Sequence, residues 1–298
     1  MYDRNSITRN FFGMPMIPIK LMKKYIITAG MLTFLFINFI ACGSQMYQMS
    51  MDEDTQSMRN SGNPDMNDPS STLYAIHATE GWTRIPISFR FASNLSESQK
   101  IHLFAAMKRW EWATGKILFD YYGEHDKQGD DFTDLYSSLN DNINGHYLDY
   151  NWSKTKKPVY VLATTIWNNS RRASQINTAD IRFNTQNYII GDSLEISATD
   201  DKEVVDMQSL ALHELGHFLG LAHVDESVDN LSIMNPSLYI GEGLTSRTLS
   251  REDIQRIQTI YGCSGDACNI NKLIKSINFE DSDYFLDLAK KEINKQRN

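Results

Sequence analysis

The sequence has little positive charge, no serine-hydrolase string and no internal repeat, and each absence narrows the function. Lys and Arg number 29 against 37 Asp and Glu, and the resulting net charge of −8 disfavours nucleic acid or anionic lipid as an electrostatic partner. Because no G-x-S-x-G string occurs, a serine nucleophile has no support. With 41% hydrophobic and 22% charged residues among 298, the composition is that of one globular domain of about 180 residues plus appendages.

One contiguous string carries most of the functional information. From His213 to His223 the chain matches H-E-x-x-H-x-x-G-x-x-H at every fixed position. On a helix, His213 and His217 lie one turn apart and reach one ion, and Glu214 can take a proton from a metal-bound water. Gly220 can adopt the left-handed backbone that ends the helix and returns His223 as a third ligand. Three protein ligands leave one position for water, which indicates a catalytic zinc ion.

This string and the residues after it resemble the metzincin superfamily of zinc endopeptidases, and within it the matrixin (matrix-metalloproteinase-like) group. Met234-Asn235-Pro236 resembles the Met-x-Pro turn that lies beneath the metal in matrixins, and residues 249–262 resemble their closing helix. The resemblance covers residues 81–263. It implies an α+β fold with a twisted mixed sheet, an edge strand over the cleft, two main helices, and a small C-terminal subdomain containing the Met-turn and closing helix.

The activity implied by the resemblance is hydrolysis of internal peptide bonds in a protein or peptide substrate. Glu214 is the expected general base, which takes the proton of the zinc-activated water and then delivers it to the leaving amine. The segment after Met234, with Pro236 and Tyr239, is expected to form the wall of the primed-side substrate pocket. Tyr239 stands one position later than the corresponding matrixin tyrosine.

Three features depart from related families. Val224 follows the third histidine where astacins carry Glu, which argues against that sister family. Animal matrixins bind a second, structural zinc ion, but His125 and His146 are the only histidines between residues 120 and 200, so we do not expect that ion here. The propeptide cysteine that keeps matrixins latent is also missing, since no cysteine lies in a candidate propeptide ahead of the catalytic core. Any latent form would therefore depend on another segment.

Residues 1–41 read as a signal peptide, with Met22 as an alternative start. An apolar run from Tyr25 to Ala41 follows three lysines and ends at Cys42, like the lipobox of bacterial lipoproteins, whose cysteine is lipidated. We therefore expect attachment to a membrane through the lipid, and export to the outer membrane or cell surface. A single transmembrane anchor or a secreted form is the alternative.

The remaining chain divides by composition into three parts. Residues 42–80 are expected to hold the lipidated cysteine and a flexible tether, because they are polar and have little apolar periodicity. The zinc protease domain is expected over residues 81–263, and a disulfide loop with a helical tail over 264–298. In an exported protein Cys263 and Cys268 are expected to form a disulfide, with a metal site as the alternative.

Local patterns predict several helices and strands. Alternating apolar residues indicate a strand at 84–91, and Ser96 with Gln99 forms a capping box for a helix that ends at Gly115. The zinc helix is expected from about 202 to 219, and Ser250 is the expected N-cap of the closing helix. Further strands are expected at 116–122, 158–164, 179–184 and 194–198.

The expected edge strand beside the metal is either Tyr188–Ile190 or Leu194–Ala198, where an extended peptide could add as a further strand.

A calcium (Ca²⁺) site is a weaker expectation. Residues 140–145 imitate the first half of an EF-hand loop, but Asn151 replaces its bidentate Glu, so a solvated acidic loop is the favoured interpretation.

Two other functions stay open at this point. The chain could be a lipid-anchored adhesin that uses the protease fold as a scaffold, although such proteins lose the general base or a ligand and this chain keeps Glu214 and all three histidines. It could also be a zinc hydrolase acting on peptidoglycan or another non-protein amide, which digestion of purified cell-wall material would reveal.

Overall fold

The computed structural model describes residues 47–50, 79–126, 143–155, 157–169, 175–276 and 282–296. The chain divides into two compact units, Met1–Gln45 and Met46–Asn298, and every described residue belongs to the second. The predicted signal peptide, Cys42, most of the predicted tether and the start of the predicted calcium loop therefore lie outside the described residues. No helix within the described ranges is both long enough and apolar enough to cross a lipid bilayer.

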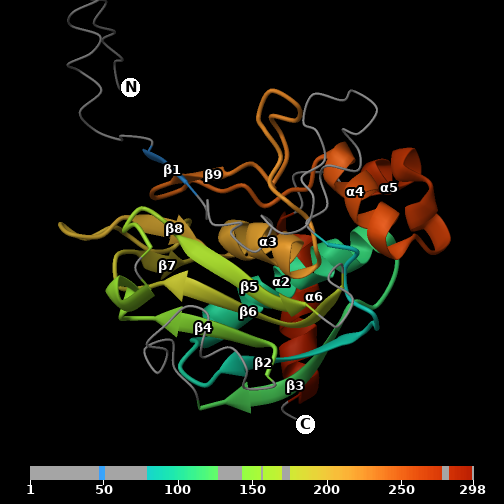
Figure 1. Cartoon of the computed structure of the whole chain (residues 1–298). Helices are drawn as coiled ribbons and strands as arrows, with labels where there is room; N and C mark the ends of the chain where they lie inside the picture. Colours follow the sequence, from blue (N-terminus) through green and yellow to red (C-terminus); the bar gives the residue numbers. More distant parts are fainter. Residues whose placement is uncertain are drawn as a thin grey trace, which may run out of the picture. The chain divides into compact units, whose positions relative to one another are not determined.

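A five-stranded mixed sheet forms the centre of the second unit (Figure 1). Its strand order is β3-β2-β4-β6-β5, and all neighbouring pairs are parallel except β5 and β6, which are antiparallel. The strands are β2 (Ile87–Ala92), β3 (Phe119–His125), β4 (Gly145–Asp149), β5 (Ala163–Asn169) and β6 (Ile176–Asn184). The sequence prediction of a mixed sheet is confirmed, and β5 is its antiparallel edge strand.

The strand positions differ from those predicted. The strands expected at 116–122 and 158–164 begin later, at Phe119 and Ala163, and the edge strand that packs beside the zinc-motif helix is β5. The prediction that Leu194–Ala198 is a strand is wrong. Asp192 accepts hydrogen bonds from three consecutive backbone N–H groups, those of Leu194, Glu195 and Ile196, so this segment forms a turn.

The other segment considered for the edge strand lies in a small sheet of its own. There β7 (Ile189–Gly191) pairs in parallel with β8 (Val204–Asp206). This pairing also corrects the predicted start of the zinc helix. The helix α3 runs from Met207 to Phe218, because Val204 and Val205 join a strand and the carboxylate of Asp206 accepts from the N–H of Ser209 as the N-cap.

The predicted capping box at Ser96 and the predicted N-cap at Ser250 are both present. Helix α2 (Glu97–Thr114) begins with Ser96 and Gln99 bonded reciprocally, and it packs against α3. Helix α4 (Arg251–Tyr261) begins with Ser250 and Asp253 bonded in the same way. These local signals were readable because each involves residues only three positions apart.

The C-terminal residues form more of the core than a peripheral tail would. After a Cys263–Cys268 disulfide come α5 (Ile270–Ser276) and α6 (Ser282–Gln296). The short 3₁₀ helices are η3 (Trp152–Thr155) and η4 (Gly265–Cys268). Phe285 of α6 is fully buried, contacts the ring of Trp112 edge-on, and lies 4.3 Å below the guanidinium of Arg109. Helix α6 therefore covers part of α2.

One short strand lies inside the predicted flexible tether. Strand β1 (Tyr47–Ser50) pairs antiparallel with β9 (Ser237–Ile240), with Tyr47 opposite Ile240 and Ser50 opposite Ser237. These four residues are therefore paired with the segment that follows Met234, which corrects the tether prediction at this point.

Candidate zinc site

Three histidine side chains converge from α3 and the loop after it. The Nε2 atoms of His213 and His217 lie 3.0 Å apart, those of His217 and His223 3.1 Å, and those of His213 and His223 3.3 Å. Three nitrogens bound to one tetrahedral zinc at 2.0–2.1 Å would lie about 3.3 Å apart, so the spacing fits that ion. Within the described residues, this is the one group of three or more candidate ligands close enough to share a metal.

The other nitrogen of two rings fixes the tautomer that a metal requires. His213 Nδ1 lies 2.7 Å from the carbonyl oxygen of Ile233, and His217 Nδ1 lies 2.9 Å from that of Leu221. Because a carbonyl only accepts, each Nδ1 carries the hydrogen and each Nε2 presents its lone pair. Burial, followed by the neighbouring His217 and His223, also holds the pKa of His213 well below 6.5, which favours the neutral, ligating form.

Gly220 makes the turn that brings the third ligand back. Its φ is +106°, and a Cβ there would lie 2.6 Å from the hydroxyl oxygen of Thr79. The last carbonyls of α3 are satisfied by distant side chains, since Trp82 Nε1 donates to Phe218 at 2.6 Å and the Tyr261 hydroxyl donates to Leu219 at 2.7 Å. Sequence reasoning did not find the role of Trp82, because nothing near it in the sequence reports a partner 136 positions away.

The turn 232–236 lies directly against α3. Met234 is fully buried, and a Cβ added at Gly216 would come within 2.2 Å of its sulfur. The helix and the turn can approach this closely only because residue 216 has no side chain. Met234 therefore contacts the helix that carries His213 and His217, and its place beneath the metal stays a prediction.

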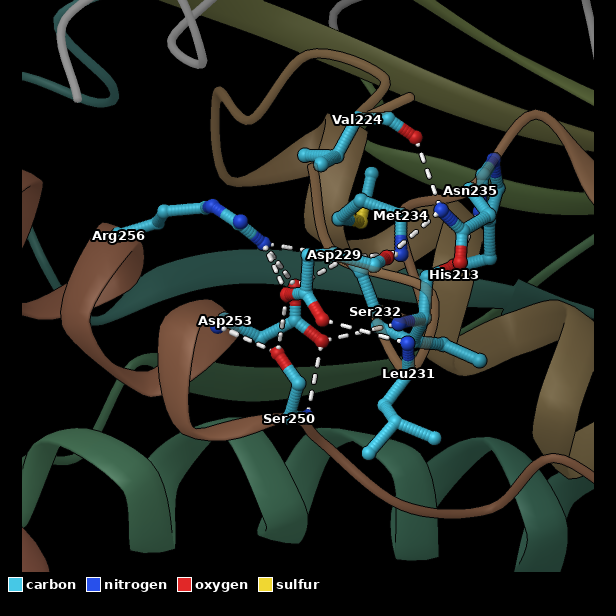
Figure 2. Close-up of polar contacts among 11 residues, drawn as sticks. His213, Val224, Asp229, Leu231, Ser232, Met234, Asn235, Ser250, Asp253 and Arg256 are labelled. Atoms are coloured by element: carbon cyan, nitrogen blue, oxygen red, sulfur yellow. Dashed lines mark hydrogen bonds and ion pairs between the residues drawn. The ribbon is translucent and has the colours of Figure 1, made fainter. Parts of the chain in front are cut away.

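A buried polar network holds this turn (Figure 2). The carboxylate of Asp253 accepts from the Ser232 hydroxyl at 2.6 Å, from the backbone N–H of Ile233 at 2.9 Å and from that of Ser250 at 3.0 Å. Arg256 donates to Asp253 at 2.9 Å and to Asp229 at 3.0 Å. Ile233 thus donates its N–H to Asp253 and accepts from His213 with its carbonyl, so the network orients the first ligand through the backbone of one residue.

Glu214 lies between His213 and His217 in the sequence of α3 and is completely buried. The hydroxyl of Thr165, on edge strand β5, lies 2.5 Å from Glu214 Oε2 and 3.1 Å from the Glu214 carbonyl oxygen. No local pattern in the sequence distinguishes Thr165 from the other threonines, because its partner lies 49 positions further along the chain.

The two residues predicted to form a pocket wall lie in different surroundings. Tyr239 is 49% exposed and borders a cavity of about 400 Å³ that is also lined by Ile233, Leu238 and Thr248. Pro236 is half-buried and is not among the described residues that line this cavity.

Comparison with known proteins agrees with the geometry. A model of the matrixin peptidase family matches residues 81–262. Metalloendoproteinase 2-MMP of Arabidopsis thaliana is 35% identical over 79 residues, which is 26% of this chain and 19% of that protein. Metalloendoproteinase 5-MMP of the same plant is 44% identical over 59 residues, 20% of this chain and 15% of that protein.

Human matrix metalloproteinase-26 is 48% identical over 59 residues, 19% of this chain and 21% of that protein. The chain thus spans about a fifth of the length of the relatives it matches. The family model, in contrast, covers more than half of the chain. The chain therefore belongs to the matrixin family of zinc-dependent metalloendopeptidases.

Proposed function

We propose that this chain is itself a zinc-dependent endopeptidase that hydrolyses internal peptide bonds, with His213, His217 and His223 holding the metal and Glu214 acting as general base. The observation that carries the proposal is the convergence of three Nε2 atoms within 3.3 Å of one another, directly beside a buried carboxylate. When bound, zinc would polarise the scissile carbonyl and lower the pKa of a water molecule to about 7.

The protein side chains do the remaining work. Glu214 accepts the proton of the attacking water and returns it to the leaving amine, and its burial strengthens each charge interaction by excluding solvent. His213 and His217 keep their Nε2 atoms in place through their Nδ1 hydrogen bonds. No covalent intermediate is required.

The sheet edge suggests how a peptide would bind. Within the described part of the chain, β5 has β6 as its single ladder partner, whereas β9 is already paired with β1. An extended peptide could therefore add to β5 by main-chain hydrogen bonds, next to the helix that carries the histidines. Tyr239, at the cavity beyond the turn, would contact residues on the primed side.

The test compares the full-length chain with a Glu214→Gln variant. Both are purified with zinc, analysed for metal content, and incubated with a diverse peptide library whose cleavage sites are mapped by mass. We expect one zinc per chain in both proteins and chelator-sensitive internal cleavage by the wild type, with the variant slower by at least about 100-fold. If both proteins bind zinc and neither cuts a peptide, the endopeptidase proposal is wrong.

A parallel digestion of purified cell-wall material distinguishes the amidase alternative. Release of soluble fragments by the wild type alone, without peptide cleavage, would favour that alternative.

Attachment to a membrane through Cys42 also belongs to the proposal, supported by the apolar run and the lipobox-like sequence before it. A Cys42→Ser variant should move from the membrane to the soluble fraction, and an unchanged distribution would contradict it.

A further inference from the structure

The hydrogen bond between Thr165 and Glu214 joins two elements that the reaction depends on. Thr165 lies on the edge strand to which a peptide could add, and Glu214 lies between two of the histidines on α3. Both residues are buried, with Thr165 at 7% exposure and Glu214 at zero. The contact therefore connects the peptide-binding edge with the carboxylate proposed as general base.

The geometry indicates which of two acceptors takes the proton. A hydroxyl carries one hydrogen, so Thr165 Oγ1 cannot donate fully to both the Glu214 carboxylate at 2.5 Å and the Glu214 carbonyl at 3.1 Å. The shorter distance lies in the range of charge-assisted O–H···O⁻ bonds, about 2.5–2.7 Å, whereas the longer one is at the weak end for this donor. Thr165 therefore donates to Oε2 of the carboxylate.

We propose that Thr165 is a positioning residue, which holds the carboxylate of Glu214 in the orientation that proton transfer requires. This inference rests on the proposed function, since it assumes that Glu214 is the base. A glutamate side chain has three rotatable bonds, and a buried donor at one oxygen removes most of its freedom. A base must lie within hydrogen-bond reach of the proton that it takes, so this loss of freedom raises the rate of the chemical step.

The alternative role for Thr165 is only to pack β5 against α3. The two roles separate because the hydroxyl, and not the bulk of the side chain, makes the contact. Thr165→Val replaces the hydroxyl by a methyl group of similar size and suits a strand, whereas Thr165→Ser keeps the hydroxyl and removes the methyl group. Thr164 is the matched control, because it is also buried but points to the opposite face of β5.

The experiment measures kcat and KM of the full-length, zinc-loaded variants on the peptide that the wild type cleaves best in the library. For Thr165→Val we expect kcat to fall about 10- to 100-fold with little change in KM or zinc content. Thr165→Ser should restore kcat to within a few-fold of the wild type, and Thr164→Val should leave it unchanged. If the valine variant does not fold, Thr165→Ala replaces it in the same comparison with serine.

Two results would overturn the inference. The first is a kcat of Thr165→Val equal to that of the wild type. The second is a Thr165→Ser variant as slow as Thr165→Val, which would show that packing and not the hydroxyl causes the loss. A double-mutant cycle with Glu214→Ala, which has no acceptor, adds a measurement that needs no catalysis, because the Thr165 and Glu214 side chains should show a coupling in the free energy of unfolding. A coupling energy of zero would contradict the hydrogen bond between Thr165 and Glu214.

The activities of the single variants separate this inference from the proposed function. If Glu214→Gln keeps full activity, the general-base assignment fails whatever Thr165 does. If Glu214→Gln is inactive and Thr165→Val behaves like the wild type, only the role of Thr165 fails.

Discussion

Two buried clusters in this protein have the same composition, one arginine between two aspartates, and yet differ in what they do. In the first, Arg247 donates to Asp192 at 2.5 Å and to Asp206 at 2.9 Å. In the second, Arg256 donates to Asp229 and Asp253 at 3.0 and 2.9 Å. The first cluster holds the N-terminal end of α3, and the second holds the turn whose carbonyl orients His213.

The pKa values of the two central aspartates shift in opposite directions. At Asp206 burial raises the pKa, but the hydrogen bond and charge of Arg247 and the bonds from Ser209 outweigh it, so the net pKa lies below 3.8. At Asp253 burial outweighs the bonds from Ser232, Ile233 and Ser250 and the charge of Arg256, so the net pKa lies above 3.8.

These directions fix the sign of each contribution to stability. The folded state binds the Asp206 proton more weakly than the unfolded chain, so Asp206 stabilises the fold above pH 3.8 and this contribution is lost as pH falls through its folded pKa. Asp253 is the reverse, because its favourable contribution is present below pH 3.8 and is lost as pH rises through its folded pKa. The contribution of Asp206 is therefore present at neutral pH, whereas Asp253 acts through the hydrogen bonds that it accepts from Ser232 and Ile233.

The largest expected effect comes from breaking the first cluster. Asp206→Asn leaves the Arg247 charge with one carboxylate instead of two, and we expect a loss of about 3–5 kcal/mol in unfolding free energy at pH 7. The measurement is urea denaturation of the zinc-loaded protein from pH 7 down to the lowest pH at which it folds. The difference from the wild type should shrink in acid, and a difference independent of pH would contradict the assignment.

A smaller effect on stability and a specific effect on zinc are expected from the second cluster. Asp253→Asn replaces one carboxylate oxygen by an NH2 group that cannot accept from the two donors facing it, and burial already disfavours the charge lost, so the loss at pH 7 should be about 1–3 kcal/mol. Because the Ile233 carbonyl orients His213, zinc affinity should fall about 10- to 100-fold. Titration against a competing chelator measures that affinity. The comparison between clusters fails if Asp253→Asn destabilises as much as Asp206→Asn and binds zinc normally.

The smallest effect should come from an exposed pair. Lys272 and Asp266 lie 2.7 Å apart, but their side chains are 61% and 76% exposed. Because solvent screens the charges, such exposed pairs stabilise a fold by only about 0–1 kcal/mol. Asp266→Asn should therefore change the unfolding free energy by no more than about 0.5 kcal/mol. A larger loss in the same denaturation experiment would mean that burial is not what separates this pair from the two clusters.

The sequence was most informative where the physics is local. The three histidines, Glu214 and Gly220 lie within eleven consecutive residues, where helical geometry relates His213, Glu214 and His217 and one turn at Gly220 returns His223. The capping box at Ser96 and the N-cap at Ser250 were equally evident from the sequence, and both helices begin after these residues.

Features that depend on distant partners were not readable. The start of α3 was misplaced because Val204 and Val205 continue its apolar pattern, and only their pairing with β7 makes them a strand. The edge strand was misplaced for the same reason, since an apolar run does not indicate which strand it will join. The contacts of Thr165 and Asp253 with the site span 49 and 20 positions, and no periodicity encodes them.

The contact between Gly216 and Met234 bears on how relatives of this protein can be recognised. Position 216 is one of the two variable places inside H-E-x-x-H, yet a Cβ there would lie 2.2 Å from the Met234 sulfur, so a larger residue would displace the methionine from its present place. A search pattern that leaves this position open also accepts zinc helices whose residue here would force the methionine side chain to move. Requiring glycine there, with a methionine downstream, selects chains by the shape of the surface beneath the ion as well as by the ligands around it.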